Sequence, residues 1–173
     1  MVTLGAMIIW LNGTFGVGKT TTSKELAALV PGARVFDSEQ VGVMLGHVLG
    51  SIPVNDFQDW RPWRTLVVET ASQVLDYVGG VLVIPQSVLV EQYWTEIRAG
   101  LGRAGIPMRH FVLHADRDTL IQRIEADGGS QWRLDHLAAY QRARAWLSRE
   151  AEVVDTAGIP APQVAHMIAA SVG

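Results

Sequence analysis

The chain has 173 residues, of which 49% are hydrophobic and 18% are charged, a composition that suits one folded domain and excludes a disordered segment. The formal net charge of −3 gives no reason to expect a nucleic-acid partner. Because the chain has no cysteine, disulfides, thiolate metal ligands and a cysteine nucleophile are excluded.

A membrane-inserted or secreted protein is not expected. No apolar run has the length of a membrane span. The start, MVTLGAMIIW, has neither the basic region nor the cleavage site of a signal peptide. A cytoplasmic protein is therefore predicted.

Short apolar strands alternate with helical segments along the chain. Strands are predicted at residues 6–11, 33–37, 81–85, 108–115 and 151–156. Helices are predicted at about 18–29, 38–50, 59–77, 89–100, 116–126 and 133–147, and from 162 onwards, with a flexible loop at 127–132. Ser38, Asp59 and Asp116 are the predicted N-caps, and Pro62 falls in a first turn. This alternation predicts an α/β fold, a single domain over 1–173 with a parallel sheet covered on both faces.

The stretch from Gly13 to Thr20, GTFGVGKT, fits the pattern G-x-x-x-x-G-K-[ST] between a strand and a helix. Glycines let the backbone turn tightly, so that several N–H groups point at phosphate oxygens. Lys19 is predicted to reach the β- and γ-phosphates, and the Thr20 hydroxyl to ligate Mg²⁺. The predicted nucleotide site consists of Gly13, Thr14, Phe15, Gly16, Val17, Gly18, Lys19, Thr20 and Thr21.

The pattern does not decide what happens to the phosphate. A regulatory GTPase needs N-K-x-D, which does not occur, and an AAA-type motor needs a longer chain and an acid after the third strand, where VLVIPQS has none. Asp37 is the one acid at the end of an early strand, where it can accept a hydroxyl proton or organise magnesium. The alternative is that Asp37 caps the following helix.

The stretches MIIWLNGTFGVGKT, DSEQVG, DFQDWRPWR and VIPQSVL resemble the bacterial tunicamycin-resistance protein family, and the similarity runs from Met7 to about Ala170. The resemblance implies a P-loop protein of the nucleotide- and shikimate-kinase type, with sheet order 2-3-1-4-5 and with ATP and Mg²⁺ as cofactors. It also implies a small-molecule acceptor such as tunicamycin, a lipid-tailed nucleoside that mimics a uridine-diphosphate sugar. The known resistance protein has a longer tail associated with membrane attachment. Because this chain stops at Gly173, peripheral membrane association is less expected here.

In nucleotide-kinase-like folds, helices corresponding to about 38–78 border the acceptor. Arg61 and Arg64 share a helix face and can clamp a phosphate. Trp60 and Trp63, at the same spacing, can stack on a base or on an acyl chain. The alternative is that the tryptophans pack in the core and the arginines are solvated. Gln86 is an acceptor-binding candidate by position alone. Gly42 and Gly46, spaced by four, fit either a shallow groove or close helix packing.

A second cationic region follows the fourth strand. Arg123 and Arg133 flank a lid-like segment at about 125–134, whose two glycines allow it to close over ATP and neutralise charge. The alternative is a solvated helix pair joined by a surface turn. The family pattern L-x-x-R-L-x-x-R keeps its first arginine as Arg123 but has Asp127 at the second. Relatives place the adenine beside the residues that correspond to Thr156, Ala157 and Gly158.

Three functions therefore stay open. The first is an ATP-dependent kinase of a nucleoside-like or antibiotic acceptor, which Asp37 and the paired arginines favour. The second is a protein that sequesters tunicamycin without phosphotransfer, which the missing acid after the third strand favours. The third is a nucleotide-dependent regulator with a protein partner, supported by the phosphate-binding loop alone.

Overall fold

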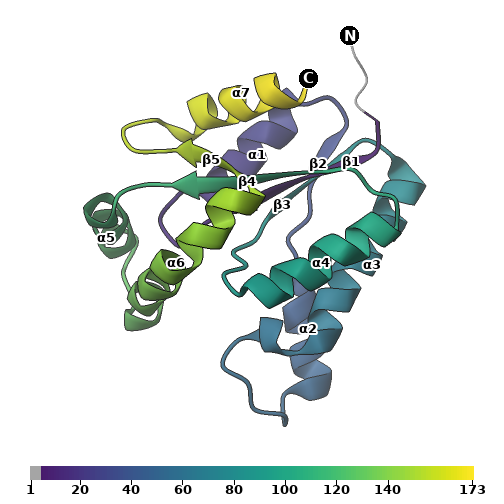
Figure 1. The fold of residues 1–173 in the computed structure, drawn as a ribbon, viewed down its shortest axis with the longest axis horizontal. Helices are drawn as coiled ribbons and strands as arrows, with labels where there is room; N and C mark the ends of the chain where they lie inside the picture. The colour runs from purple at the N-terminus through teal and green to yellow at the C-terminus, as the bar shows by residue number, and fades with distance from the viewer. Residues whose placement is uncertain (1–4) are drawn as a thin grey trace.

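A computed structural model describes residues 5–173, which form an α/β domain with helices on both faces of one sheet (Figure 1). The strands are β1 (Met7–Asn12), β2 (Ala33–Val35), β3 (Val81–Pro85), β4 (Met108–His114) and β5 (Glu152–Asp155). The helices are α1 (Lys19–Leu29), α2 (Glu39–Leu49), the 3-10 helix η1 (Phe57–Asp59), α3 (Arg61–Val78), α4 (Glu91–Arg103), α5 (Arg117–Ala126), α6 (Gln131–Glu150) and α7 (Ala161–Val172). Residues 1–4, where the segment tested for a signal peptide begins, lie outside the described residues.

The sheet has the order β2-β3-β1-β4-β5, and all four neighbouring pairs are parallel, which confirms the predicted fold class and strand order. Helices α1 and α7 pack together on one face, and α3 and α4 pack together on the other (Figure 1). The central strand β1 pairs with both β3 and β4. Ligands of open parallel sheets bind beyond the carboxyl ends of the strands, so the end of β1 marks the region of the site.

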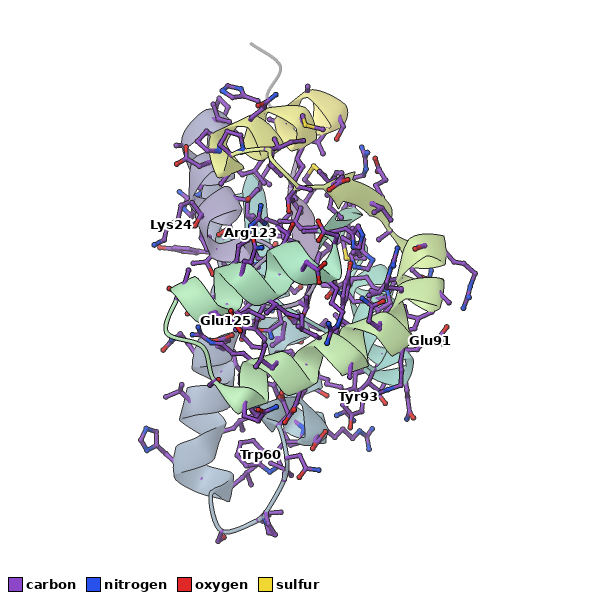
Figure 2. The ribbon with its side chains drawn as sticks, turned by 90° about the vertical axis from the view of Figure 1, so that its left-hand side faces the viewer. Lys24, Trp60, Glu91, Tyr93, Arg123 and Glu125 are labelled. Carbon is purple, nitrogen blue, oxygen red and sulfur yellow. The ribbon has the colours of Figure 1, made fainter. Side chains whose placement is uncertain are left out.

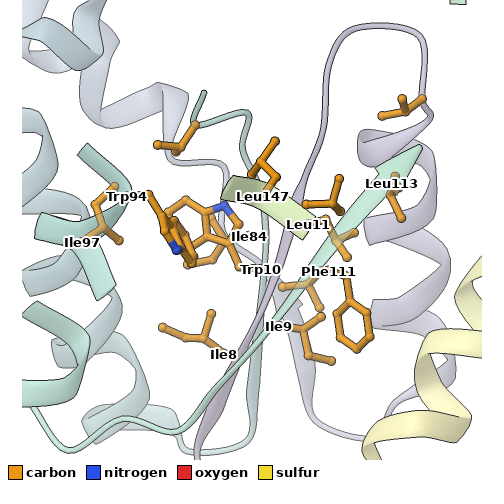
Figure 3. Close-up of a cluster of buried hydrophobic side chains, with 14 of the residues drawn as sticks. Ile8, Ile9, Trp10, Leu11, Ile84, Trp94, Ile97, Phe111, Leu113 and Leu147 are labelled. Carbon is orange, nitrogen blue, oxygen red and sulfur yellow. The ribbon is translucent and has the colours of Figure 1, made fainter. Parts of the chain in front are cut away.

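The core is built around β1, whose residues Ile8–Leu11 are all 0% exposed. Successive side chains point to opposite faces of a strand. Trp10 therefore faces Trp94 of α4, with their ring centroids 5.2 Å apart, while Ile9 lies on the face towards α7 (Figure 3). The Trp10 indole N–H donates to the carbonyl of Gln86 at 3.0 Å, so the buried ring also holds the chain just beyond β3.

The start of α3 differs from the prediction. Asp59 was predicted to cap this helix, but its carboxylate accepts the N–H groups of Asn55 and Asp56, and Asp56 in turn accepts the N–H of Gln58. This reciprocal capping closes η1, and α3 begins only at Arg61. The predicted place of Pro62 in the first turn is confirmed.

The predicted flexible loop at 127–132 is shorter than expected. The Ser130 hydroxyl accepts the N–H of Arg133, and this cap lets α6 begin at Gln131. The lid-like segment is therefore the tip of a helical hairpin formed by α5 and α6, with four residues, 127–130, between the helices.

None of the helices within residues 5–173 combines the length and the apolar character that a membrane crossing requires.

The two glycines of α2 have different surroundings. A Cβ atom at Gly42 would lie 2.7 Å from the ring of Phe57, whereas a Cβ atom at Gly46 would meet no atom within 4 Å. The structure therefore supports the close-packing explanation at Gly42, where η1 lies against α2.

This contrast predicts opposite effects of one substitution. Gly42→Ala forces the Phe57 ring to move and should lower the free energy of unfolding by about 1 kcal/mol or more. Gly46→Ala, the matched control in the same helix, should raise it by about 0.5–1 kcal/mol through helix propensity. Urea unfolding of both variants provides the measurement. Equal effects of the two substitutions would contradict the packing explanation.

Candidate active site

The phosphate-binding loop leaves β1 through the buried side chain of Asn12. Its Oδ1 accepts the N–H groups of Gly13 at 2.8 Å and Val88 at 2.9 Å, and its Nδ2 donates to the carbonyl of Val88 at 3.0 Å. Nδ2 also lies 3.3 Å from Nε2 of His110. All polar atoms of this side chain are thus paired, and they tie the start of the loop to the segment after β3 and to β4.

His110 completes this network as a neutral ring. Its Nδ1 lies 3.2 Å from the carbonyl of Glu150, so Nδ1 carries the proton and Nε2 accepts from Asn12. Burial against the indole of Trp94, at a centroid distance of 3.8 Å, lowers the pKa of His110 to about 4. The imidazole is therefore uncharged at neutral pH.

The loop itself has the geometry of an anion-binding cradle. Gly13, Gly16 and Gly18 have φ values of 131°, 81° and 87°, and a Cβ at Gly13 would lie 2.6 Å from the carbonyl oxygen of Leu113. The N–H groups of residues 14–18 have no hydrogen-bond partner within residues 5–173, and neither does the buried hydroxyl of Thr14. Open donors at the start of a helix are what phosphate oxygens satisfy. The residues present therefore fit a bound nucleotide phosphate.

Lys19 is the cation of this cradle. Its Nζ donates to the carbonyl of Thr14 at 2.7 Å and lies 5.7 Å from the centroid of the Phe15 ring. Burial lowers the pKa of Lys19 to about 8, and the negative charge of Glu39 acts in the opposite direction. A desolvated ammonium at this place interacts strongly with an incoming anion.

A cavity of about 670 Å³ opens from the loop. Its cationic side chains are Lys19, Arg123 and Arg133. Its other polar side chains include Glu39, Asp56, Gln58, Asp59, Gln86 and Ser87. Its aromatic side chains are Phe15, Phe57, Tyr93, Trp132 and His136. The cavity thus joins a phosphate-binding end to a wall of carboxylates, amides and rings.

Arg123 links the loop to the turn after β5. It lies on α5 (Figure 2), and its Nη1 is 3.2 Å from the carbonyl of Gly16, while its Nη2 is 2.9 Å from the carbonyl of Thr156. Thr156 is buried, whereas Ala157 and Gly158 are exposed, and none of the three is among the residues that line the cavity. A role of this turn in adenine binding stays a prediction.

Arg133 has an acidic partner at the tip of the hairpin. Its Nη1 lies 3.0 Å from Oδ2 of Asp127, and its guanidinium carbon lies 5.8 Å from the centroid of Phe15. Asp127 and Arg133 both line the cavity. Only Nη1 of Arg133 is engaged in this pair, so its other N–H groups remain available to an anion in the cavity.

The predicted acid Asp37 lies outside the cavity lining, and its role in proton transfer stays a prediction. The Asp37 carboxylate accepts the N–H of Glu39 and the side-chain amide of Gln40, both at 3.1 Å, and Asp37 is not among the residues that line the cavity. Glu39 does line it. Desolvation and the charge of Asp37 raise the pKa of Glu39, and Lys19 opposes the shift. The sequence pattern did not indicate Glu39 as a cavity residue, although Glu39 comes two positions after Asp37 and starts α2.

Ser38, between these acids, is the predicted N-cap of α2. It occupies the N-cap position, but its side chain makes no capping hydrogen bond. Its hydroxyl donates instead to Oε1 of Gln86 at 2.8 Å. This bond aims the Gln86 amide at the end of β3, and Gln86 lines the cavity at the position predicted for it.

The predicted arginine clamp does not assemble. Arg64 is buried, with its Nε 2.6 Å from Oε2 of Glu96 and its guanidinium carbon 4.2 Å from the ring centroid of Tyr93, whereas Arg61 is exposed. Neither arginine lines the cavity. Arg64 is drawn away from the cavity by a tertiary contact, since α4 supplies the carboxylate of Glu96 and the ring of Tyr93.

The predicted stacking residue Trp60 also lies outside the cavity lining, well apart from Arg123 in Figure 2. Its helical neighbour Trp63 is fully buried, packs against Phe57 and donates its indole N–H to the carbonyl of Ser38. The packing alternative therefore describes Trp63 and also Trp60, which is half-buried against the core. The aromatic lining of the cavity comes from other residues.

Comparison with known proteins agrees with this geometry. A family model described as an AAA domain matches residues 9–146. The tunicamycin resistance protein of Deinococcus radiodurans superposes with a TM-score of 0.82 at 31% identity, over 97% of this chain and 96% of that one. The chain belongs to the tunicamycin-resistance protein family and carries an AAA domain of the P-loop kinase-like type. No curated protein matches the chain by sequence.

Two more distant structures share the fold alone. A gluconokinase from Sinorhizobium meliloti superposes with a TM-score of 0.65 at 18% identity, over 96% of this chain and 91% of that one. A shikimate kinase from Acinetobacter baumannii, solved with shikimate, superposes with a TM-score of 0.62 at 18% identity, over 94% and 90% of the two chains.

The Asn12 network predicts a large effect on stability. Asn12→Ala leaves several buried donors and acceptors without partners, each worth about 1–3 kcal/mol, so we expect a loss of about 3 kcal/mol or more in the free energy of unfolding. Asn55→Ala, at an exposed loop position, should change it by less than about 0.5 kcal/mol. Denaturant unfolding compares the two. A small effect of Asn12→Ala would mean that the network does not hold the loop.

Proposed function

We propose that the protein is an ATP- and Mg²⁺-dependent phosphotransferase that transfers the γ-phosphate of ATP to a hydroxyl group of a nucleoside-like or antibiotic acceptor. The observation that carries the proposal is one continuous cavity, lined both by the phosphate-binding loop with Lys19 and by Glu39, whose charge acts on that of Lys19. Tunicamycin is the first acceptor to test, because the resistance protein of Deinococcus radiodurans is named for it. The use of ATP makes the cytoplasm the expected compartment.

In this proposal the loop holds the nucleotide. The N–H groups of residues 14–18 bind the phosphate oxygens, with Lys19 between the β- and γ-phosphates. Thr20, in the first turn of α1 and in the cavity wall, is the protein ligand of Mg²⁺, a metal that neutralises charge on the phosphates. Thr21 lines the same wall. The turn at 156–158 borders the adenine.

The carboxylate of Glu39 receives the acceptor's hydroxyl proton as the acceptor oxygen bonds to the γ-phosphorus. The bond between that phosphorus and the bridging oxygen breaks, and its electron pair leaves with ADP. A carboxyl group whose pKa is raised is suited to this proton transfer near neutral pH. Lys19, Arg123 and Arg133 stabilise charge on the transferred group.

The second candidate function is sequestration of tunicamycin without phosphotransfer. It is favoured by the amide of Gln86, which stands at the end of β3 where kinases of this class often have an acid, and which is held by Ser38. Both functions need the nucleotide cradle, and only the first needs a base.

A direct transfer assay tests the proposal. Incubation with γ-labelled ATP, Mg²⁺ and tunicamycin or uridine-diphosphate sugars should give a labelled small molecule, identified by mass analysis. Glu39→Gln should lower the rate of transfer by about 10²-fold or more with ATP affinity within a few-fold. Asp37→Asn is the matched control and should keep most of the rate, because Asn also caps helices. Binding of tunicamycin without any transfer would select sequestration, and an inactive Asp37→Asn beside an active Glu39→Gln would return the role of base to Asp37.

The desolvation of Lys19 predicts a pH dependence of ATP affinity. The free protein has a lowered pKa of about 8 at Lys19, and bound phosphate favours the charged form. Below about pH 8 the group is already protonated, so affinity changes little. Above it, binding must first take up a proton, and affinity should fall by up to about tenfold per pH unit.

Calorimetric titrations from about pH 7.5 to about pH 10 provide this measurement. Lys19→Arg should remove the slope, because the guanidinium keeps its charge over that range. A slope that persists in the arginine variant would assign the dependence to another group.

A further inference from the structure

Three rings from two distant parts of the chain meet beside the phosphate-binding loop. The ring of Phe15 lies 5.1 Å from that of Trp132 and 5.3 Å from that of His136, and the last two are 4.2 Å apart, measured between centroids. Phe15 belongs to the loop, whereas Trp132 and His136 belong to the first turns of α6. We call these three rings the aromatic shelf.

The shelf belongs to the cavity wall and not to the core. Trp132 is 51% exposed, although it is large and apolar. Trp132, His136 and Ala139 are spaced by four and three residues, lie on one face of α6 and all line the cavity. The core-facing side of this helix is formed by other residues, including Leu137 and Tyr140, which are buried. An exposed tryptophan held in place by two other rings leaves an aromatic surface open to a ligand.

The charges around the shelf indicate what such a ligand carries. Nζ of Lys19 and the guanidinium carbon of Arg133 lie 5.7 Å and 5.8 Å from the centroid of Phe15, so the shelf adjoins the phosphate-binding end. Asp56 also lines the cavity, and it is close enough to His136 for the imidazole charge to lower its pKa against the raising effect of burial. A ring on the shelf therefore has cations near Phe15 and a hydrogen-bond acceptor for hydroxyl groups near His136.

We propose that the aromatic shelf binds a planar unsaturated ring of the acceptor by stacking, and that Trp132 is the residue that sets the preference for such acceptors over plain sugars. The assignment of this wall to the acceptor rests on the function proposed above. Stacking is tolerant of the identity of the ring, because every heterocycle of this kind presents a π-face. The hydroxylated part of the same molecule then extends towards Asp56 and Glu39.

Calorimetric binding tests this without any phosphotransfer. The protein is saturated with a non-hydrolysable ATP analogue and Mg²⁺ and titrated with uridine, 5,6-dihydrouridine and ribose. Dihydrouridine is the matched probe, because reduction removes the planarity of the ring and leaves its polar groups in place. Uridine should bind about tenfold or more tightly than ribose, and dihydrouridine should lose most of that gain.

Variants connect this preference to the shelf. Trp132→Leu should bring the uridine-to-ribose affinity ratio close to one with affinity for the ATP analogue unchanged, and Trp132→Phe should restore most of the ratio. Tyr77→Leu, which removes a 90% exposed aromatic side chain from α3, should leave the ratio as in the wild type. Melting temperatures of all variants control for folding.

The outcomes separate this inference from the proposed function. A uridine preference that depends on Trp132, without labelled product from any acceptor, supports the shelf and contradicts phosphotransfer. The inference is overturned if uridine, dihydrouridine and ribose bind alike, if no nucleoside binds, or if Trp132→Leu keeps the preference. Each of these results can occur in a protein that transfers phosphate.

Discussion

The paired side chain of Asn12 is the interaction on which the rest of the site depends. Asn12 ends the central strand, and its amide bonds to the first residue of the loop, to the segment after β3 and to the ring of His110. Fully satisfied polar groups in a dry interior permit few other arrangements, because each misplaced donor or acceptor loses its partner. The loop therefore leaves the sheet in one direction, and it lines the cavity together with residues of α2, η1 and α6.

The cavity beside the loop contains desolvated groups of both charge signs, Lys19 and Glu39. Burial lowers the pKa of Lys19 and raises that of Glu39, because desolvation destabilises the charged form of each group. A bound phosphate relieves the first, and an acceptor's proton relieves the second. The same desolvation thus prepares the cation for binding and the carboxylate for proton transfer, which is why the two groups share one cavity in the proposed function.

The helical hairpin of α5 and α6 contributes two arginines, Arg123 and Arg133, and the ring of Trp132 to the cavity wall. Arg123 near the end of α5 holds the loop against the turn after β5, and Arg133 at the start of α6 is held by Asp127. Next to Arg133 in the chain, Trp132 lies with its ring against Phe15 of the loop and against His136, one turn further along α6. Because the connecting turn has only four residues and Ser130 caps α6, helices and not a long loop place these side chains.

The sequence by itself determined the phosphate-binding loop, the alternation of strands and helices and, through the family resemblance, the strand order, because these follow from local spacing and from the period of apolar residues. It indicated Asp37 and gave no sign that Glu39 lines the cavity. Both acids suit the start of α2, and only the direction of the helix decides which carboxylate turns into the cavity and which one caps. The tertiary structure likewise decided that Trp132, and not Trp60, lines the cavity, since exposure depends on packing between elements that are far apart in the chain.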